Sequence, residues 1–567
     1  MILLHSNQKL KKRMNNFKIY KDDYKRFLVC PKFMWLMRNK RNPEVISWVK
    51  NNLTFLDKER EKKFFSSFQY KYEKKATTEL DIRIISGIWF ETKVIDYLKT
   101  KYKMFIFNRT ENKTSLEKNN FTKQIIQSKQ FNAYHQAYFC YEEYVTRCDL
   151  LIEDKKGELD IYEIKGVNKI TAKKRRNEFL NDLTYQIWIL KKLKYKVNNA
   201  FILHFDEDYV YQEKLDINNL YKVEEKFNNH ETKDKDISET LVKISKKLQN
   251  DLINSKNILL SPFCEEFETN SSICTNLIKK INDKYNWLNL YRLKRTKKAD
   301  LYFKNEGNSI NLENIKFNTF DLTSVQKRSI KVVQNLEKII KNTKIVHEEL
   351  QKYHFPIYFY DFETTPIAIP KFKNSIPWLQ IPFQYSIHVL INSDYNLVKN
   401  KNIQHLDFVI ENRKDPRYLF LKQFLNDIGK FGQGTYVAYN MSFEKSILAK
   451  LSKHLDLDEK DHQQINHIIE NTVDVKDFFK DFNIYHKDFF GSLSIKKILP
   501  ALLPKINYKN LKIKEGGEAS ALYFNYIHKI ISQNEWEENI KDLKKYCALD
   551  SKAMLLIYEK IKELVKI

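Results

Sequence analysis

The spacing of hydrophobic residues in the first half of the chain changes from helical to strand-like. Residues 18–100 predict mainly helix, ending in 85–100, where Phe90, Val94 and Leu98 recur at helical spacing. A further helical pattern follows at 181–195. Strand-like segments, short and rich in β-branched or aromatic residues, lie at 137–144, 148–154, 158–166 and 200–208. Strands followed by a helix and a strand predict an α/β core.

A second pattern of this kind begins after a long charged region. Residues 210–350 are helical in pattern and rich in charge, and 323–353 has apolar residues at helical spacing without a strand partner, which predicts a connecting helix. At His354-Phe355-Pro356 the pattern changes to strand. The expected elements are strands at 357–364, 383–391 and 435–440 and a helix at 417–431. These elements predict a second α/β unit.

The length of the chain agrees with more than one domain. A chain of 567 residues is too long to fold around a single hydrophobic core, and an apolar content of 42% is enough to form several cores. We therefore expect the α/β class, with two mixed α/β domains at 1–225 and 351–567 joined by a helical, charged connecting region at 226–350.

The cysteines and the apolar runs indicate a cellular compartment. Six cysteines lie far apart, which argues against a disulfide framework. The amino terminus has too short an apolar stretch for a signal peptide, and no apolar run approaches the length that spans a membrane. The sequence predicts a cytoplasmic protein without a membrane segment.

The net charge has two explanations. A charge of +27 suits a polyanionic partner such as DNA or RNA, because each lysine that meets a phosphate releases a counterion. Few glycines and many lysines are also the composition that an AT-rich genome produces in any protein. The basic run Lys173–Arg176 fits a phosphate contact, but in a chain this rich in lysine a solvated face is the better explanation.

Two acids in the second unit are candidates for metal binding. Asp361 and Glu363 are two apart on a predicted strand, so both side chains leave the same face. Two carboxylates on one face can hold a hard cation such as Mg²⁺. Acid-x-acid triplets are common by chance, but this one ends an apolar strand, where charge is costly without a ligand.

Two further segments add to this set. Asn440 leads from a strand into a helix start that carries Glu444, and the last helix places Tyr546 and Asp550 one turn apart. Four carboxylates and a tyrosine are the groups that two-metal phosphoryl hydrolysis needs. The alternative is that Tyr546 and Asp550 solvate a terminal helix and Glu444 neutralises the start of its helix.

These motifs resemble those of the DnaQ-like, DEDD-type exonucleases of the RNase H-like superfamily. The segments IPWLQIPFQYSIHV, FFGSLSIKKILPALLP and EGGEASALYF are also similar to a bacterial family of uncharacterised domain proteins, and the resemblance covers nearly all of 355–560. It implies a nuclease with Mg²⁺ or Mn²⁺. Glutamate stands at 444, where the superfamily usually has aspartate. The implied metal ligands are Asp361, Glu363, Glu444 and Asp550, with Tyr546 orienting water and Asn440 contacting substrate.

The first unit carries an acid set of its own. Asp149 starts one strand, and the neighbouring strand ends in Glu163-x-Lys165, with both polar side chains on one face, before Gly166, which permits a tight turn. Metal-assisted hydrolysis would use Asp149 and Glu163 for the cation and Lys165 to position and deprotonate water or to neutralise a phosphate. A Glu-x-Lys pair is also common on a solvent-exposed strand edge.

Together with Glu91 upstream and Gln186 downstream, these strands resemble the RecB-like branch of the PD-(D/E)XK nucleases, over roughly residues 20–210. The resemblance implies that Glu91 supports the metal site and that Gln186 contacts substrate. Leu190 stands where many relatives have tyrosine. Some relatives hold an iron–sulfur cluster with four cysteines. Cys30, Cys264 and Cys274 lack a clear fourth ligand, so no cluster is expected.

The expected function, as the two resemblances imply, is a cytoplasmic fusion of two metal-dependent nucleases that act on DNA or RNA: a RecB-like nuclease in the first unit and a DnaQ-like 3′ to 5′ exonuclease in the second. The main alternative is a non-catalytic nucleic-acid-binding or scaffold protein that keeps both folds. An acid-pair hydrolase such as a glycosidase is a third class, but it gives no reason for the Tyr-x-x-x-Asp helix or the Glu-x-Lys strand.

Overall fold

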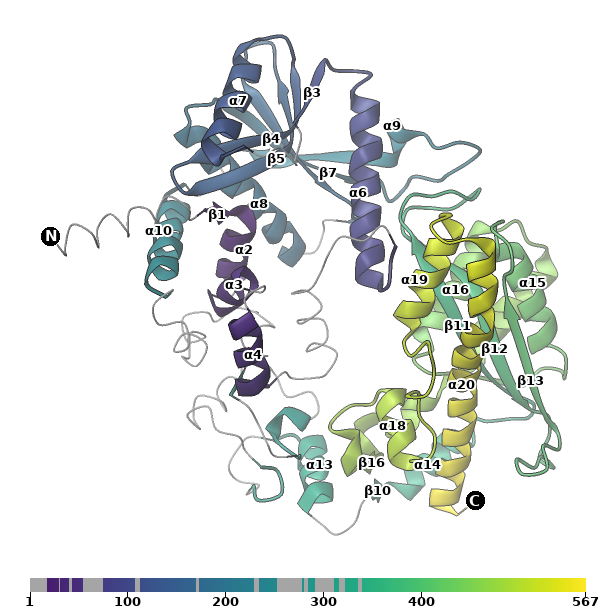
Figure 1. The fold of residues 1–567 in the computed structure, drawn as a ribbon. Coiled ribbons are helices and arrows are strands. Elements are labelled where there is room, and N and C mark those ends of the chain that lie inside the picture. The colour runs from purple at the N-terminus through teal and green to yellow at the C-terminus, as the bar shows by residue number, and fades with distance from the viewer. Residues whose placement is uncertain are drawn as a thin grey trace.

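Two α/β units, each built around its own main β-sheet, make up the protein in a computed structural model (Figure 1). The α/β class expected from the sequence is confirmed. The structure describes residues 18–29, 31–39, 43–54, 75–107, 113–169, 173–228, 234–251, 278–279, 284–290, 311–315, 322–334 and 339–566.

The main sheet of the first unit is built largely from strands within residues 133–228. Its strands, in spatial order, are β3 (Met104–Ile106), β4 (Ala133–Tyr141), β5 (Tyr144–Glu153), β6 (Leu159–Lys165), β7 (Val197–Phe205) and β8 (Tyr221–Asn228), with β1 (Ile19–Tyr20) beside β5. β6 and β7 are parallel, since α8 (Lys173–Lys192) connects them. Leu150 and Leu151 pack into cores on opposite faces, so the sheet is covered on both sides.

Helices cover the two faces of this sheet. On one face, α6 (Glu79–Leu98) packs Phe90 and Val94 against the strands. It begins at Thr78, whose hydroxyl accepts from the Asp81 N–H in a capping box. The second core takes side chains from α2 (Lys21–Val29), α3 (Pro31–Arg38), α7 (Ser115–Gln127), α8 and α10 (Asp234–Asp251). Shorter elements are α4 (Pro43–Asn52), α9 (Ile217–Leu220) and β2 (Leu53–Thr54), which pairs with β9 (Ile278–Lys279).

The C-terminal sheet has the Asp-x-Glu strand at its centre. Its order is β13 (Ile403–Val409), β12 (Leu379–Leu390), β11 (Ile357–Ile367), β14 (Thr435–Ala438) and β15 (Thr472–Asp474). β11, β12 and β13 are antiparallel neighbours, whereas β14 and β15 run parallel to β11. Tyr358 and Phe359 enter cores on opposite faces. A central strand buried on both faces explains why this segment is almost wholly apolar.

Two groups of helices sandwich this sheet. One face carries α15 (Arg417–Ile428), α16 (Ser442–His454) and α17 (Glu459–Glu470). The other carries α18 (Ile495–Leu502), α19 (Gly516–Ile527) and the long α20 (Gln533–Val565), which runs beside the sheet in Figure 1.

The connecting region expected at 226–350 is not a separate body where the structure describes it. Instead of one helix at 323–353, the chain forms α13 (Ser324–Gln334), β10 (Ile339–Lys341) and α14 (Thr343–Leu350), and β10 pairs with β16 (Ile484–His486). Val346 of α14 lies in the C-terminal core, and Leu241 of α10 lies in the N-terminal core. The apolar faces of these helices need a core to pack against, so both ends of the region join the neighbouring units.

The two units contact each other along α6 and α19. Trp89 of α6 stacks on Phe524 of α19 with the ring centroids 5.5 Å apart. The buried Asn525 side chain accepts from the Ala76 N–H at 2.8 Å and donates to the Ala76 carbonyl at 2.7 Å. Figure 1 shows α6 extending from the N-terminal sheet to α19. The amino-terminal end of α6 is therefore packed against the C-terminal unit.

Gly166, directly after the Glu-x-Lys strand, lies at a second contact between the units. A Cβ atom at this position would be 3.0 Å from the Cα atom of Gly87 on α6, so a side chain would push the strand and the helix apart. The Trp378 indole of the C-terminal unit donates to the Gly166 carbonyl at 3.1 Å. Close packing of three elements, beyond the tight turn expected from the sequence, accounts for glycine here.

Candidate active site

The Asp-x-Glu pair lies in the middle of the C-terminal sheet. Asp361 and Glu363 leave one face of β11, while Phe362 packs into the core on the other face. The pairing of β11 with β12 shifts register directly after Glu363. Such irregularities often occur beside functional sites, where they re-aim a side chain.

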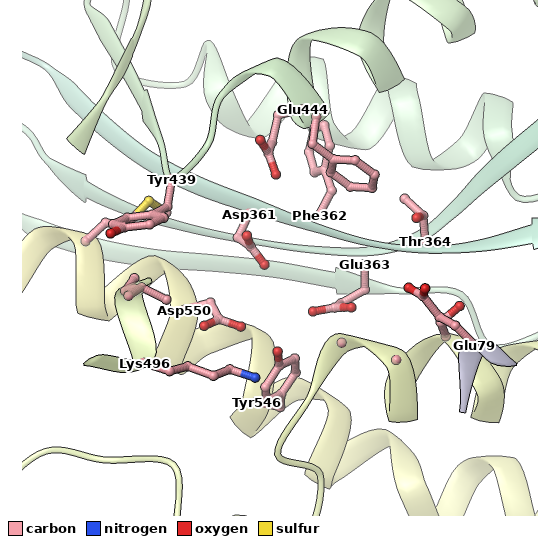
Figure 2. A pocket seen from close by; sticks show the side chains of 16 residues that line it. Glu79, Asp361, Phe362, Glu363, Thr364, Tyr439, Glu444, Lys496, Tyr546 and Asp550 are labelled. Atoms are coloured by element: carbon pink, nitrogen blue, oxygen red, sulfur yellow. The ribbon is translucent and has the colours of Figure 1, made fainter. Parts of the chain in front are cut away.

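The distant acids of the second unit line one cavity of about 270 Å³. Figure 2 shows the carboxylates of Asp361, Glu363, Glu444 and Asp550 around a common space, with Tyr546 beside them. The side chains come from β11, from the first turn of α16 and from α20. Folding thus brings together five side chains that the sequence suggested for one site.

Glu444 reaches the cavity through the turn between β14 and α16. Asn440 adopts a left-handed conformation with φ +67°, which asparagine tolerates better than most residues. Asp474, at the end of β15, accepts from the N–H groups of Asn440 at 3.0 Å and Met441 at 3.1 Å. The Asn440 side chain is exposed and does not line the cavity. In the structure Asn440 forms the turn, and its expected substrate contact stays a prediction.

The helix α20 supplies three side chains to this site. Tyr546 and Asp550 both line the cavity, one turn apart. Tyr508, from the loop between α18 and α19, donates to Asp550 Oδ1 at 2.5 Å. Cys547 is fully buried, and its sulfur lies 3.9 Å from Asp361 Oδ2. Tyr508 and Cys547 were not anticipated at the site.

Burial and mutual repulsion make these carboxylates difficult to ionise together. Burial raises the pKa of Glu444 to about 8. Burial also raises the pKa of Asp550 to about 6, and the hydrogen bond from Tyr508 limits this rise. For Asp361 and Glu363, burial first and the charge of Asp550 second raise the pKa well above the usual range. A bound cation would compensate the same charges that protons otherwise neutralise.

The donor atoms fit a hard divalent cation. One ligand atom from each of Asp361, Glu363 and Cys547 lies within 4.8 Å of the others. Glu444 Oε2 is buried and has no hydrogen-bond partner, which costs free energy unless a ligand satisfies it. Carboxylate oxygens suit Mg²⁺ and Mn²⁺, and the Cys547 thiol adds a softer donor.

Replacing Glu444 with Gln is expected to stabilise the metal-free protein at pH 8. The folded pKa of Glu444 is raised from 4.5 to about 8, so its contribution to stability falls as the pH rises from about 4.5 to about 8. Glutamine carries no such penalty. Thermal melts in EDTA should show a Tm gain of a few degrees at pH 8, since ~1 kcal/mol shifts the Tm of a domain of this size by roughly 2–4 °C, and little gain near pH 5.

Glu459 provides a matched control for this variant. It lies in the first turn of α17, as Glu444 does in α16, but it is exposed. Glu459→Gln should keep the native pH dependence and the native response to Mn²⁺, whereas Glu444→Gln should weaken the Tm increase that Mn²⁺ produces. A Glu444→Gln protein that melts below the native protein throughout this pH range would contradict the assignment.

The acids of the N-terminal unit form a second cluster, in which Glu163 is fully paired. Glu163 Oε1 accepts from Lys21 at 2.7 Å and from Lys165 at 2.8 Å, and Oε2 accepts from Gln186 at 2.6 Å. Burial alone would raise the pKa of Glu163, but the two ammonium groups outweigh burial and hold the pKa well below the usual range. Lys165 also donates to Asp182 at 2.8 Å.

Asp149 and Glu91 meet on the other side of this cluster. The Gln136 amide nitrogen donates to Glu91 Oε1 at 2.6 Å and to Asp149 Oδ1 at 3.2 Å, and it therefore bridges the two acids. The Ile164 N–H donates to Asp149 Oδ2 at 3.1 Å. Burial and the charge of Glu163 raise the pKa of Asp149 to about 7. Glu91, from α6, thus joins the site that the sequence suggested.

The cluster differs in two details from the sequence expectation. Gln186 is fully buried and donates to Glu163, so it holds an acid in place instead of facing a substrate. Lys21 was not anticipated. The side chains of Lys173–Arg176 and the iron–sulfur candidates Cys30, Cys264 and Cys274 lie outside the described residues.

Comparisons with known proteins match parts of this chain. Residues 358–494, which include Asp361, Glu363 and Glu444, match the family described as "Domain of unknown function (DUF2779)". "Uncharacterized protein MG366" of Mycoplasma genitalium is 30% identical over 225 residues, which cover 37% of this chain and 32% of that protein. "Uncharacterized protein UU173" of Ureaplasma parvum serovar 3 is 31% identical over 225 residues, 36% of this chain and 31% of that protein.

The chain spans about a third of the length of these curated relatives. No solved structure matches it.

Proposed function

We propose that the C-terminal unit is a metal-dependent exonuclease of the DnaQ-like type that shortens DNA or RNA from the 3′ end. Asp361, Glu363, Glu444 and Asp550 would hold Mg²⁺ or Mn²⁺. One observation carries this proposal: four carboxylates from three elements, three of them buried and that of Asp361 half-buried, surround one cavity, and Glu444 Oε2 has no partner there. The central position of the Asp-x-Glu strand and the placing of the other motifs on α16 and α20 support the same resemblance.

The side chains of the cavity have separable roles in this proposal. Burial and the nearby acids raise the pKa of Tyr546, so its phenol stays protonated and its O–H is available to orient a water molecule. Tyr508 fixes one oxygen of Asp550. Bound divalent cations would neutralise the charge of the phosphate and make the attacking water easier to deprotonate.

The reaction is hydrolysis of the terminal phosphodiester. A water oxygen forms a bond to phosphorus and loses a proton. The bond from phosphorus to the 3′ oxygen of the preceding nucleotide breaks, and that oxygen takes up a proton. The products are a nucleoside 5′-monophosphate and a chain that ends in a new 3′ hydroxyl.

The N-terminal unit is proposed to keep a RecB-like nuclease site at Asp149, Glu163, Lys165 and Glu91. The carboxylate oxygens of this site are already hydrogen-bonded to protein groups. An amide bridges Asp149 and Glu91, and two lysines pair with Glu163. A cation would have to displace these groups. This observation favours, for this unit alone, the second candidate function of binding nucleic acid without cleavage.

The partner and the location complete the proposal. A net charge of +27 supports a nucleic acid partner. Cys140, Cys148 and Cys547 are free thiols, as is usual in a reducing cytoplasm. Among the described residues, no helix combines the length and the apolar character needed to cross a membrane.

A cleavage assay with the full chain tests the exonuclease. Single- and double-stranded DNA and RNA, labelled at the 5′ end or the 3′ end, are incubated with Mg²⁺, Mn²⁺ or EDTA. We expect a ladder that shortens from the 3′ end, release of nucleoside 5′-monophosphates and no reaction in EDTA. Tight binding without cleavage of any substrate, with either metal, would favour the non-catalytic alternative instead.

A further inference from the structure

The cavity floor has the same sign of charge as a nucleic acid chain. Metal-binding carboxylates repel a phosphodiester, so a substrate phosphate needs positive groups on the opposite wall. Among the described residues that line the cavity, Lys496 is the one basic side chain, and it is accompanied by Gly516 and Gly517 at the start of α19.

The Lys496 side chain is held beside the acids. It leaves the first turn of α18, donates to the Lys514 carbonyl at 2.9 Å and lies 5.9 Å from the centre of the Tyr546 ring. Figure 2 shows its ammonium group next to Tyr546, with Asp550 and Glu363 beyond it. The residue is exposed, so its charge is accessible to a ligand that enters the cavity.

The start of α19 presents peptide groups to the same space. The first N–H groups of a helix have no partner within the helix, and no side chain caps α19 at Glu515. These groups carry the positive end of the helix dipole, which favours anions. A Cβ atom at Gly516 would lie 3.5 Å from Glu363 Oε2 and 3.8 Å from the Tyr546 hydroxyl. Glycine therefore leaves open the space between the acids and the helix.

A separate observation indicates that this cavity is built for a ligand. Glu444, on the opposite side of β11 from α19, is 3% exposed, and its Oε2 atom has no hydrogen-bond partner. A buried carboxylate oxygen without a partner is costly, and a cation with its bound phosphate would satisfy it.

We propose that Lys496 and the amino terminus of α19 form an anion subsite that holds the phosphate of the terminal nucleotide against the acid cluster. The inference rests on the proposed exonuclease and adds a substrate class to it: the cavity binds a nucleoside 5′-monophosphate, the product that retains the scissile phosphate, and discriminates against the uncharged nucleoside.

Isothermal titration of the full chain with deoxyadenosine 5′-monophosphate and with deoxyadenosine, in Mn²⁺, tests the subsite. The native protein should bind the monophosphate at least tenfold more tightly than the nucleoside. Lys496→Met should weaken monophosphate binding roughly 10- to 100-fold, the range for loss of a charged hydrogen bond, and leave nucleoside and Mn²⁺ binding unchanged. Lys496→Arg should retain most of the affinity.

Lys497 offers a matched control. It is the next residue of α18, is exposed, and lies 5.4 Å from the Phe490 ring instead of in the cavity. Lys497→Met should bind the monophosphate as the native protein does. Equal losses in both variants, unchanged binding in Lys496→Met, or no monophosphate binding by the native protein would overturn the subsite.

The subsite and the exonuclease fail in different ways. Cleavage with no effect of Lys496→Met on monophosphate binding would leave the exonuclease standing without the subsite. Conversely, monophosphate binding that depends on Lys496, without any cleavage, would keep the subsite and refute the exonuclease. Gly516→Leu, which fills the cavity without removing charge, should also weaken monophosphate binding, and its Tm shows whether the fold survives.

Discussion

Replacing Asp361 with Asn is expected to reduce metal-dependent cleavage about a thousandfold, because loss of a metal ligand removes several kcal/mol of transition-state stabilisation and ~4 kcal/mol corresponds to that factor. The same variant should make the metal-free protein more stable. Burial and neighbouring acids raise the pKa of Asp361 well above its usual range, so ionisation costs stability as the pH rises above about 4. Single-turnover cleavage and thermal melts in EDTA measure the two effects.

The expected fall in cleavage rate together with a rise in Tm distinguishes loss of the site from damage to the fold. A variant that loses activity by unfolding would lose Tm as well. Asp407→Asn is the control. Asp361 on β11 pairs with Ser386 on β12, and Ser386 pairs in turn with Asp407 on β13, so the two aspartates lie at the same level of the sheet. Asp407 does not line the cavity, so the cleavage rate of this variant should stay near native. Native-like cleavage by Asp361→Asn would refute the exonuclease site.

Replacing Glu163 with Gln is expected to destabilise the protein by about 3 kcal/mol, or roughly 6–12 °C in the Tm of the N-terminal unit. The substitution leaves the ammonium groups of Lys21 and Lys165, whose side chains are 20% and 21% exposed, without their shared carboxylate. The pKa of Glu163 is held below 4.5, so its contribution is present above about pH 4.5 and is lost as the pH falls below it.

The deficit of Glu163→Gln should therefore shrink when thermal melts are repeated at lower pH. Glu158→Gln serves as the control, because Glu158 forms a long ion pair, 4.0 Å, with the exposed Lys196, and the effect of this substitution should stay within about 0.5 kcal/mol. Shortening of DNA from the 3′ end at a temperature below both transitions should remain near native. An undiminished Tm in Glu163→Gln would show that the lysines do not depend on this carboxylate.

The sequence located the side chains whose position follows from local rules. Asp361 and Glu363 stand out because charge interrupts an apolar strand, and their spacing alone places them on one face. The helical period likewise placed Tyr546 beside Asp550. For these residues, the covalent spacing already fixes the local geometry, and folding only has to bring the segments together.

Residues supplied by long-range packing gave no such signal. Lys21 meets Glu163 across 142 positions of sequence, and Tyr508 meets Asp550 across 42. In a chain with 99 lysines and arginines and 33 tyrosines, a single lysine or tyrosine stands out by no pattern. Lys496 was missed for the same reason, although its segment contributed to the family resemblance.

Short strands and one turn were also hidden. β10, β15 and β16 have three residues each, too few for an alternating pattern to show. The strand expected at 137–144 straddles a hairpin between β4 and β5, whose turn contains Glu142 at φ +53°. Glycine or asparagine usually marks such a turn, and with glutamate at this position nothing in the segment indicated that the strand ends there.

The helix α6 carries Glu91 to the N-terminal cluster, while its first residue, Glu79, lines the C-terminal cavity. The two glutamates are twelve positions apart, about 18 Å along the helix axis. An inserted or deleted residue between them would turn one glutamate by about 100° relative to the other. The length of this stretch therefore sets the direction in which each glutamate points relative to the other, a constraint separate from the packing of its side chains.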